Sequence, residues 1–405
     1  MKMTIRLLTI SKILFVVYLL YANVFGVVFH VNGLSEALLI VTFVLAMISR
    51  KLRFPKNSSL WALLVFAAYI LLSAFFVSYN ITRAVRSIIS FIELLGVFAL
   101  IIVYCEQDGK IDFVLNAFIA EGLITVLYMF FRGTNAARIS ISENINVNTI
   151  GITLAFSIGF ILYFLIEKRN KPFKWFISIA AIAALLIGIM LTVSKKAIIG
   201  GAVLIILWII LCYRFTFAKL KLFWKVFIFL GLVAVGIFAY KWYKSNYAHQ
   251  IEVLTKRMDD LYVGDSDQAR LLYIKEGFRI FLTHPFFGVG FNNARYYMPR
   301  ETYTHCLYSE LPACTGIIGT IIFGYALIQP SMMIVKSRKI IKRTDLFLNT
   351  RIKYILAFFL VFLAVNLAQI SFYSSNLMYV LSVIAGFAVC VSSIEVQPED
   401  SNASH

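Results

Sequence analysis

The stretch SLWALLVFAAYILLSAFFVS, residues 59–78, contains no charged side chain. A run of this length and composition predicts a transmembrane helix, because about 20 apolar residues span the hydrocarbon core of a bilayer. Similar runs recur along the whole chain, which is 61% hydrophobic and only 14% charged. Lipid offers the backbone no water to bond with, and the alternation typical of a barrel is absent, so we expect a helical bundle.

The apolar runs predict an all-α polytopic membrane protein with about 12 transmembrane helices and no internal repeat. The approximate ranges are 9–29, 34–49, 59–78, 87–105, 113–131, 147–166, 176–193, 197–213, 224–242, 311–335, 354–371 and 376–394. The first run lacks a small-residue cleavage site, so we interpret it as a retained helix rather than a signal peptide.

Basic residues gather in alternate loops, which sets the predicted orientation. If the N-terminus is cytoplasmic, most of them fall inside. These inside groups are Lys2, Arg6, Lys12, Lys110 and residues 50–56, 167–174, 214–225 and 336–353. The short outside loops keep only Arg83, Arg86, Arg132, Arg138, Lys195 and Lys196. Both termini are therefore expected in the cytoplasm, and the net charge of +18 is assigned to loops facing anionic lipid rather than to nucleic-acid binding.

One outside loop is too long to be a simple connector. We expect helices 1–9 in residues 1–242, an external helical loop in 243–310, helices 10–12 in 311–396 and a cytoplasmic tail in 397–405. Two stretches of the loop, 250–263 and 267–285, have helical periodicity.

Arg270 is predicted to lie on the apolar face of a helix that starts near Ser266. Its neighbours on that face are Ile274, Gly277 and Phe281. Lys275 and Arg279 fall on the opposite, solvated side. A buried arginine requires an anion, which is either an acidic side chain or a phosphate that suits the planar guanidinium.

Other polar groups of the outside face are candidates for the same site. Lys195 and Lys196 sit between two apolar helices, where they either extend to the headgroups or face a cavity. Arg138 and Asn148 lie in RISISENINVNTIG, residues 138–151, whose asparagines are candidate helix caps.

His305 precedes the tenth predicted helix, with Tyr303 and Glu310 nearby. An imidazole can accept a proton near neutral pH. Cations without a matching acidic cluster, a histidine and a lipid boundary together favour an anionic lipid substrate such as a lipid pyrophosphate. The cysteines show no metal-ligand spacing, so we expect no metal; a disulfide between Cys306 and Cys314 stays open.

The segment from Ser266 to Gly324 resembles the signature region of the O-antigen polymerase and O-antigen ligase superfamily. The resemblance is carried by SDQARLLYIKEGFRIFLTHPFFGVGFNNARYY and by THCLYSELPACTGIIGTIIFGY. LTVSKKA, residues 191–197, and RISISENINVNTIG resemble two further motifs of that family. The resemblance implies a glycosyltransferase class C-like membrane fold and inverting transfer of a glycan from undecaprenyl pyrophosphate to an acceptor hydroxyl, with no metal, nucleotide or other cofactor.

Carried over by position, the resemblance implies that Arg270 binds pyrophosphate and that His305 is catalytic, as a base or as a hydrogen-bond partner. Lys195 replaces an arginine of many members, which keeps the charge but loses the bidentate fork. Cys306 stands where many members have asparagine. We also expect Arg138 at the pyrophosphate, and supporting roles for Lys196, Asn148, Tyr303 and Glu310.

The leading hypothesis is a polymerase of lipid-linked repeat units for a capsule, exopolysaccharide or O-antigen, in the bacterial cytoplasmic membrane. The alternative is a ligase that transfers the glycan to lipid A-core or another acceptor. A lipid or anion transporter is less favoured, because charges should then lie near the bilayer midplane and repeats should be visible. A scaffold would leave the outer cations without a purpose. Expected partners are the glycan donor and acceptor, membrane lipids, a chain-length regulator and a flippase, but no nucleic acid.

Overall fold

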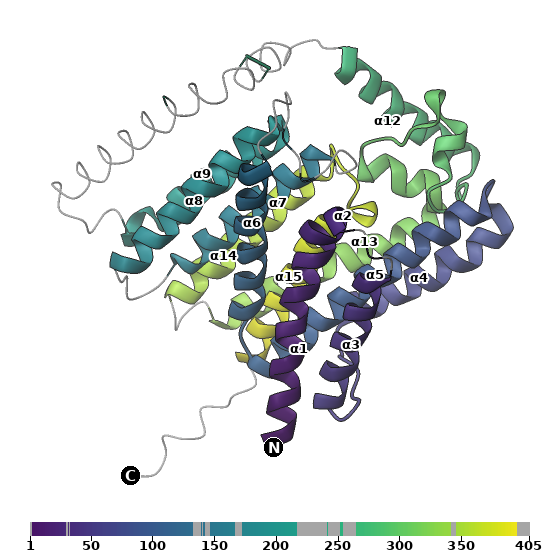
Figure 1. Ribbon diagram of the computed structural model, residues 1–405. Helices are drawn as coiled ribbons and strands as arrows, with labels where there is room; N and C mark the ends of the chain where they lie inside the picture. Colours follow the sequence, from purple (N-terminus) through teal and green to yellow (C-terminus); the bar gives the residue numbers. More distant parts are fainter. Residues whose placement is uncertain are drawn as a thin grey trace. The chain divides into compact units, whose positions relative to one another are not determined.

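The computed structural model describes residues 2–29, 31, 33–132, 139, 141, 146–166, 172–216, 241, 252–253, 265–341 and 346–394. In these ranges every regular element is a helix, and ten helices are long and apolar enough to cross a membrane (Figure 1). The protein is therefore an all-α multi-pass membrane protein, as the apolar runs predicted. Almost all of the predicted helix 224–242 lies outside the described residues, as do residues 243–251 and 254–264 of the expected external loop.

The chain divides into two compact units, which are described separately. The first comprises Met1–Glu121, Asp265–Asp345 and Phe362–His405, and the second Gly122–Gly264 and Leu346–Val361. Helices of the first unit are α1 (Lys2–Leu20), α2 (Gly26–Phe29), α3 (Leu34–Ser49), α4 (Ser58–Val77), α5 (Ile81–Asp108), α12 (Asp265–Thr283), α13 (Leu307–Ile341) and α15 (Ser375–Ile394). Those of the second are α7 (Val147–Phe164), α8 (Pro172–Thr192) and α9 (Lys195–Thr216). Both units contain residues of α6 (Asp112–Arg132) and α14 (Leu346–Val365).

Polar caps, rather than the limits of the apolar runs, decide where several helices begin. The Asn57 side chain accepts the Leu60 N–H at 3.0 Å and starts α4. The Asn80 side chain accepts the Arg83 N–H at 2.9 Å, so α5 starts six residues before the predicted residue 87. Each cap satisfies an amide that would otherwise lack a partner in the first helical turn.

Aromatic packing joins the segment after α12 to the helices of the first unit. The Phe66 ring of α4 lies 5.6 Å from the Phe91 ring of α5 and 5.1 Å from the Phe323 ring of α13. Phe291, which follows α12, inserts its fully buried ring 6.2 Å from Phe66. The Phe291 side chain therefore anchors this segment in the core between the helices, and this holds the backbone of the polar residues next to Phe291 in place.

The tenth predicted helix, placed approximately at 311–335, contains a break in the structure. α13 extends from Leu307 to Ile341, but Gly316 has φ 62° and ψ −166°, which is not helical. The predicted range 354–371 is wrong, since α14 covers Leu346–Val365. Hydrophobicity identifies the part of a helix that prefers lipid, but it reports neither backbone breaks nor the polar turns that extend a helix.

Candidate active site

One narrow face of α12 packs against α13 and against the segment that follows α12 in the chain. Tyr273, Gly277 and Ile280 are buried on this face, and Arg270 lies half-buried one turn before Tyr273. A Cβ atom added to Gly277 would lie 2.7 Å from the Thr304 side chain, so glycine allows α12 to approach the residues around His305. Arg270 is thus placed on the buried side of α12, in the same unit as His305.

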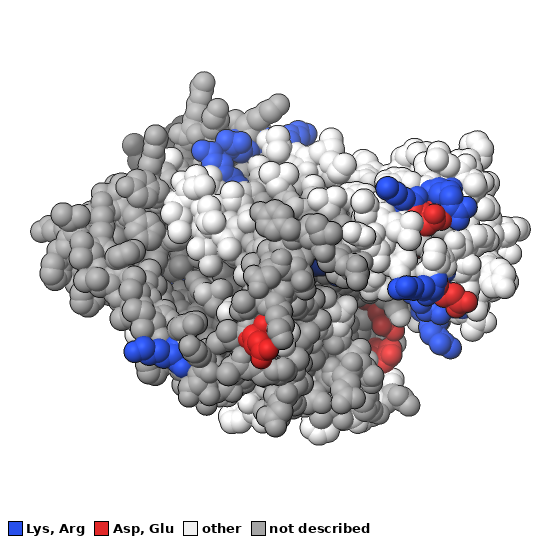
Figure 2. All heavy atoms as spheres, turned by 90° about the horizontal axis from the view of Figure 1, so that it is seen from above, with Lys and Arg blue, Asp and Glu red and all other residues white. Residues whose placement is uncertain are grey.

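The basic residues on the other side of α12 are differently placed. Arg279 is exposed and pairs with Glu276 at 2.6 Å, and Lys275 is exposed. Seen from above, the described surface is mostly uncharged, and several of its blue basic side chains have red acidic neighbours (Figure 2). An exposed ion pair such as Arg279–Glu276 is screened by solvent and contributes little to stability.

The turn after α12 lies against the break in α13. The Ile317 N–H donates to the Pro285 carbonyl at 2.8 Å, and the Val289 N–H donates to the Ala313 carbonyl at 3.0 Å. A side chain at Gly316 would overlap the Phe286 carbonyl group. The glycine therefore lets two backbone segments pair where helix would otherwise continue, and this pairing fixes the first turns of α13.

His305 stands two residues before the first residue of α13, in a left-handed backbone conformation with φ 60°. Positive φ is uncommon for a residue other than glycine and needs support from its surroundings. The Glu310 carboxylate accepts the Thr304 N–H at 2.8 Å, and the Leu307 N–H donates to the Asn366 carbonyl at 2.9 Å. His305 is therefore held on both sides by hydrogen bonds of its neighbours.

Aromatic rings surround the His305 imidazole. The Tyr303 ring centroid lies 4.1 Å from it and the Tyr273 ring centroid 6.4 Å. Burial raises the pKa of Tyr303, and the positive charges of Arg295 and Arg270 partly oppose that rise. Tyr303 packs directly on His305, and the Glu310 carboxylate bonds the N–H of the neighbouring Thr304. Arg270 lies near enough for its charge to lower the pKa of Tyr303.

Glu310 also belongs to a buried polar cluster that the sequence did not predict. Its carboxylate accepts longer hydrogen bonds from the Tyr373 hydroxyl, at 3.4 Å, and from the Cys314 thiol, at 3.6 Å. Burial raises the pKa of Tyr373 well above its ordinary value, so Tyr373 stays a donor. Cys306 and Cys314 are both buried free thiols, so the structure contains no disulfide between them. No metal-binding group of three His, Cys, Asp or Glu occurs in the described ranges.

Four candidates lie in the second unit or outside the described residues. Lys195 and Lys196 are half-buried at the start of α9, after the buried turn residue Ser194. The Asn148 N–H donates to the Asn146 side chain at 2.9 Å, which makes Asn146 the cap of α7. Arg138 lies outside the described residues.

Arg295 is a half-buried cation of the site that sequence reasoning missed. Its guanidinium lies 6.0 Å from the Tyr303 ring centroid. It belongs to a short 3₁₀ helix, η2 (Ala294–Tyr297), within an irregular segment. Helical periodicity identified Arg270, but it offers no signal for a residue in such a segment.

The chain was compared with known families and with curated proteins. Residues 180–324 match the O-antigen ligase family, Wzy_C. The match confirms the resemblance to the O-antigen polymerase and ligase superfamily, and it includes Lys195, Arg270 and His305. It supports a membrane glycosyl-transfer function of the O-antigen ligase and polymerase type, with lipid-linked glycan substrates. A search of curated proteins finds no match to the chain.

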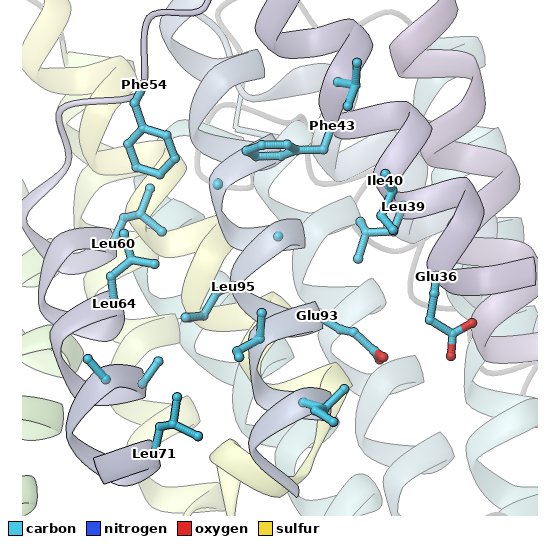
Figure 3. Close-up of a pocket in the computed structure, with 17 residues that line it drawn as sticks. Glu36, Leu39, Ile40, Phe43, Phe54, Leu60, Leu64, Leu71, Glu93 and Leu95 are labelled. Carbon is cyan, nitrogen blue, oxygen red and sulfur yellow. The ribbon is translucent and has the colours of Figure 1, made fainter. Parts of the chain in front are cut away.

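The first unit also contains an apolar groove of 720 Å³ between α3, α4 and α5 (Figure 3). Leucine, isoleucine, phenylalanine and alanine side chains dominate its lining, and Glu36 and Glu93 lie toward one end. Its lining includes no Lys, Arg or His. The groove therefore offers no group suited to binding pyrophosphate, and we do not place the transfer site in it.

Proposed function

We propose that the protein is a polysaccharide polymerase of the bacterial cytoplasmic membrane. It joins oligosaccharide repeat units carried on undecaprenyl pyrophosphate, by inverting and metal-independent glycosyl transfer. The observation that carries the proposal is the setting of His305: a constrained imidazole, packed on Tyr303 and supported by Glu310, within the segment that matches the family.

In the proposed step, the hydroxyl oxygen of the acceptor sugar attacks the anomeric carbon of the donor from the face opposite the pyrophosphate. The carbon–oxygen bond to pyrophosphate breaks, and lipid pyrophosphate leaves with the bonding electrons. His305 either takes the hydroxyl proton as a base or donates a hydrogen bond in the transition state. Negative charge grows on the leaving group, so fixed cations near it lower the barrier.

Arg270 is the proposed principal partner of the pyrophosphate, with Lys195 and Arg138 as further cations. Arg270 is supported by its place on the buried face of α12 and by its electrostatic effect on Tyr303. Lys195 and Arg138 rest on the resemblance. Tyr303 and Glu310 support His305, and Lys196 and Asn148 are assigned to the subsite of Lys195.

The matched family favours a second candidate, an O-antigen ligase that transfers a lipid-linked glycan to lipid A-core or another acceptor. Both reactions use the same donor chemistry and differ in the acceptor. In either case we propose cytoplasmic termini and an active site on the periplasmic or extracellular face, because basic residues collect in the opposite loops. A flippase and a chain-length regulator are the proposed protein partners.

The acceptor decides between the two candidates. Purified protein would be incubated with a lipid-pyrophosphate oligosaccharide, first alone and then with lipid A-core. A ladder of lengthened lipid-linked products from the donor alone supports a polymerase. Product formed only after lipid A-core is added supports a ligase and overturns the polymerase proposal.

A further inference from the structure

Arg295 is held in place by its neighbours in the chain. The Asn293 side chain accepts the Asn80 N–H at 2.7 Å, and the Asn80 side chain donates to the Tyr296 hydroxyl at 3.0 Å. Ala294 is fully buried. The backbone of Arg295 is therefore tied to the start of α5, and its side chain leaves from a fixed point.

One donor of the Arg295 guanidinium is left without a hydrogen-bond partner among the described residues. This donor is the Nε atom, which is buried. Glu310 is the nearby acid, since the charge of Arg295 acts on it, but the Glu310 carboxylate takes its hydrogen bonds from Thr304, Tyr373 and Cys314. A buried donor without a partner is costly, and a guanidinium is shaped to bind a carboxylate or phosphate through two bonds.

The position of Arg295 links this unused donor to the proposed site. Its guanidinium lies over the Tyr303 ring, and the same ring packs on His305. Arg270 also acts on Tyr303 through its charge. Arg270 of α12 and Arg295 of η2 therefore both lie near Tyr303, whose ring packs more closely on the proposed catalytic histidine than that of Tyr273 does.

We propose that Arg295 binds a second oxyanion of the substrate, in addition to the one assigned to Arg270. The identity of the substrate rests on the proposed function. The oxyanion has two sources with the same chemistry, which are a phosphate of the lipid pyrophosphate and a carboxylate on an acidic sugar of the glycan. The second source would make Arg295 a determinant of specificity for acidic repeat units.

Binding measurements on the purified full-length protein test this inference with Arg295→Gln and Arg295→Lys. Arg279→Gln is the matched control, because Arg279 is exposed and pairs only with Glu276 in the described surroundings. The probes are farnesyl pyrophosphate, farnesyl monophosphate, a glucuronate-containing oligosaccharide and a neutral oligosaccharide. Thermal melting of each variant reports any loss of the Tyr303 contact.

Loss of a charged, bidentate contact is expected to weaken binding by about 10- to 100-fold. If the pyrophosphate is the source of the oxyanion, Arg295→Gln weakens the binding of farnesyl pyrophosphate by this factor and weakens the binding of farnesyl monophosphate less. If an acidic sugar is the source, Arg295→Gln weakens only the binding of the glucuronate-containing oligosaccharide. Arg295→Lys, which keeps the charge and loses the fork, is expected to lie between wild type and Arg295→Gln, and it carries the test if Arg295→Gln does not fold.

The inference would be overturned if Arg295→Gln bound every probe within about two-fold of the Arg279→Gln control. A change that small is what the loss of an exposed ion pair produces. Equal weakening of all four probes, the neutral oligosaccharide included, would also overturn it, because that pattern indicates a structural role. The proposed function fails separately: a wild type that binds through Arg295 but transfers no glycan would contradict the transferase and leave the oxyanion site standing.

Discussion

Replacement of Gly316 by alanine should damage the site without touching any proposed catalytic group. Gly316 adopts φ 62° and ψ −166°, a region that is essentially restricted to glycine. The added Cβ atom would overlap backbone atoms of Phe286 and Phe287, which cannot rotate away as a side chain could. The turn after α12 must therefore separate from α13, or α13 must change its path.

The expected cost follows from two terms. The unfavourable backbone conformation costs about 1–3 kcal/mol. Separation of the turn also breaks at least one of its hydrogen bonds to α13, such as that from Ile317 to Pro285 at 2.8 Å, at about 1 kcal/mol each. The free energy of unfolding should thus fall by about 2–4 kcal/mol, which corresponds to a Tm lower by about 2–5 °C for a chain of 405 residues.

Gly324→Ala is the matched control on the same helix, because no atom lies within 4 Å of the Cβ it would add. Alanine in a helix interior is favoured over glycine by about 0.5–1 kcal/mol, so this variant should keep or raise the Tm. Thermal melting and glycan transfer would be measured on both proteins in the same detergent. Equal Tm values and equal activities would refute the view that pairing of the turn with α13 shapes the site.

Three further substitutions test individual residues. Glu310→Gln should lower kcat by about 10-fold with little effect on KM, because it removes the charge from the bond that holds Thr304, whereas exposed Glu301→Gln should leave both unchanged. Tyr303→Phe should leave the shape of the pH–rate profile unchanged between about pH 6 and 9, because the raised pKa of Tyr303 keeps its hydroxyl protonated in that range. The stability that the buried, protonated Tyr303 gives the wild-type protein is lost only as the pH rises through that pKa. A profile shifted by the substitution would contradict this. Lys195→Gln should lower kcat/KM by about 10- to 100-fold, whereas Lys195→Arg, which keeps the positive charge, should retain activity. Equal activity of the two variants would show that Lys195 does not bind the pyrophosphate.

The membrane helices were predictable because lipid imposes a simple requirement on length and composition. The run 59–78 became α4 at Ser58–Val77, a shift of one residue. α14 was less predictable: it starts at Leu346, eight residues before the predicted start, because the basic stretch LFLNTRIK continues the helix beyond its most apolar part. Hydrophobicity gives no direct signal for such a polar extension.

The buried face of α12 was predictable, because helical periodicity applies to it. The helical spacing of Arg270 and Gly277 indicated a buried face, and α12 buries Gly277 and leaves Arg270 half-buried. The break at Gly316 depends on pairing with residues about thirty positions earlier, and the role of Arg295 depends on contacts with Tyr303. Both are tertiary features, which no local pattern in the chain reports.

The most direct test of the account is glycan transfer by His305→Ala, compared with His284→Ala. His284 is an exposed histidine of the same segment, packed beside Tyr297 rather than Tyr303. With purified protein and an authentic lipid-pyrophosphate oligosaccharide, His305→Ala should reduce kcat by about 10²- to 10⁴-fold, the usual range for loss of a general acid or base. His284→Ala should behave as wild type. Transfer by His305→Ala at the wild-type rate would contradict the assignment of His305 and with it the proposed mechanism.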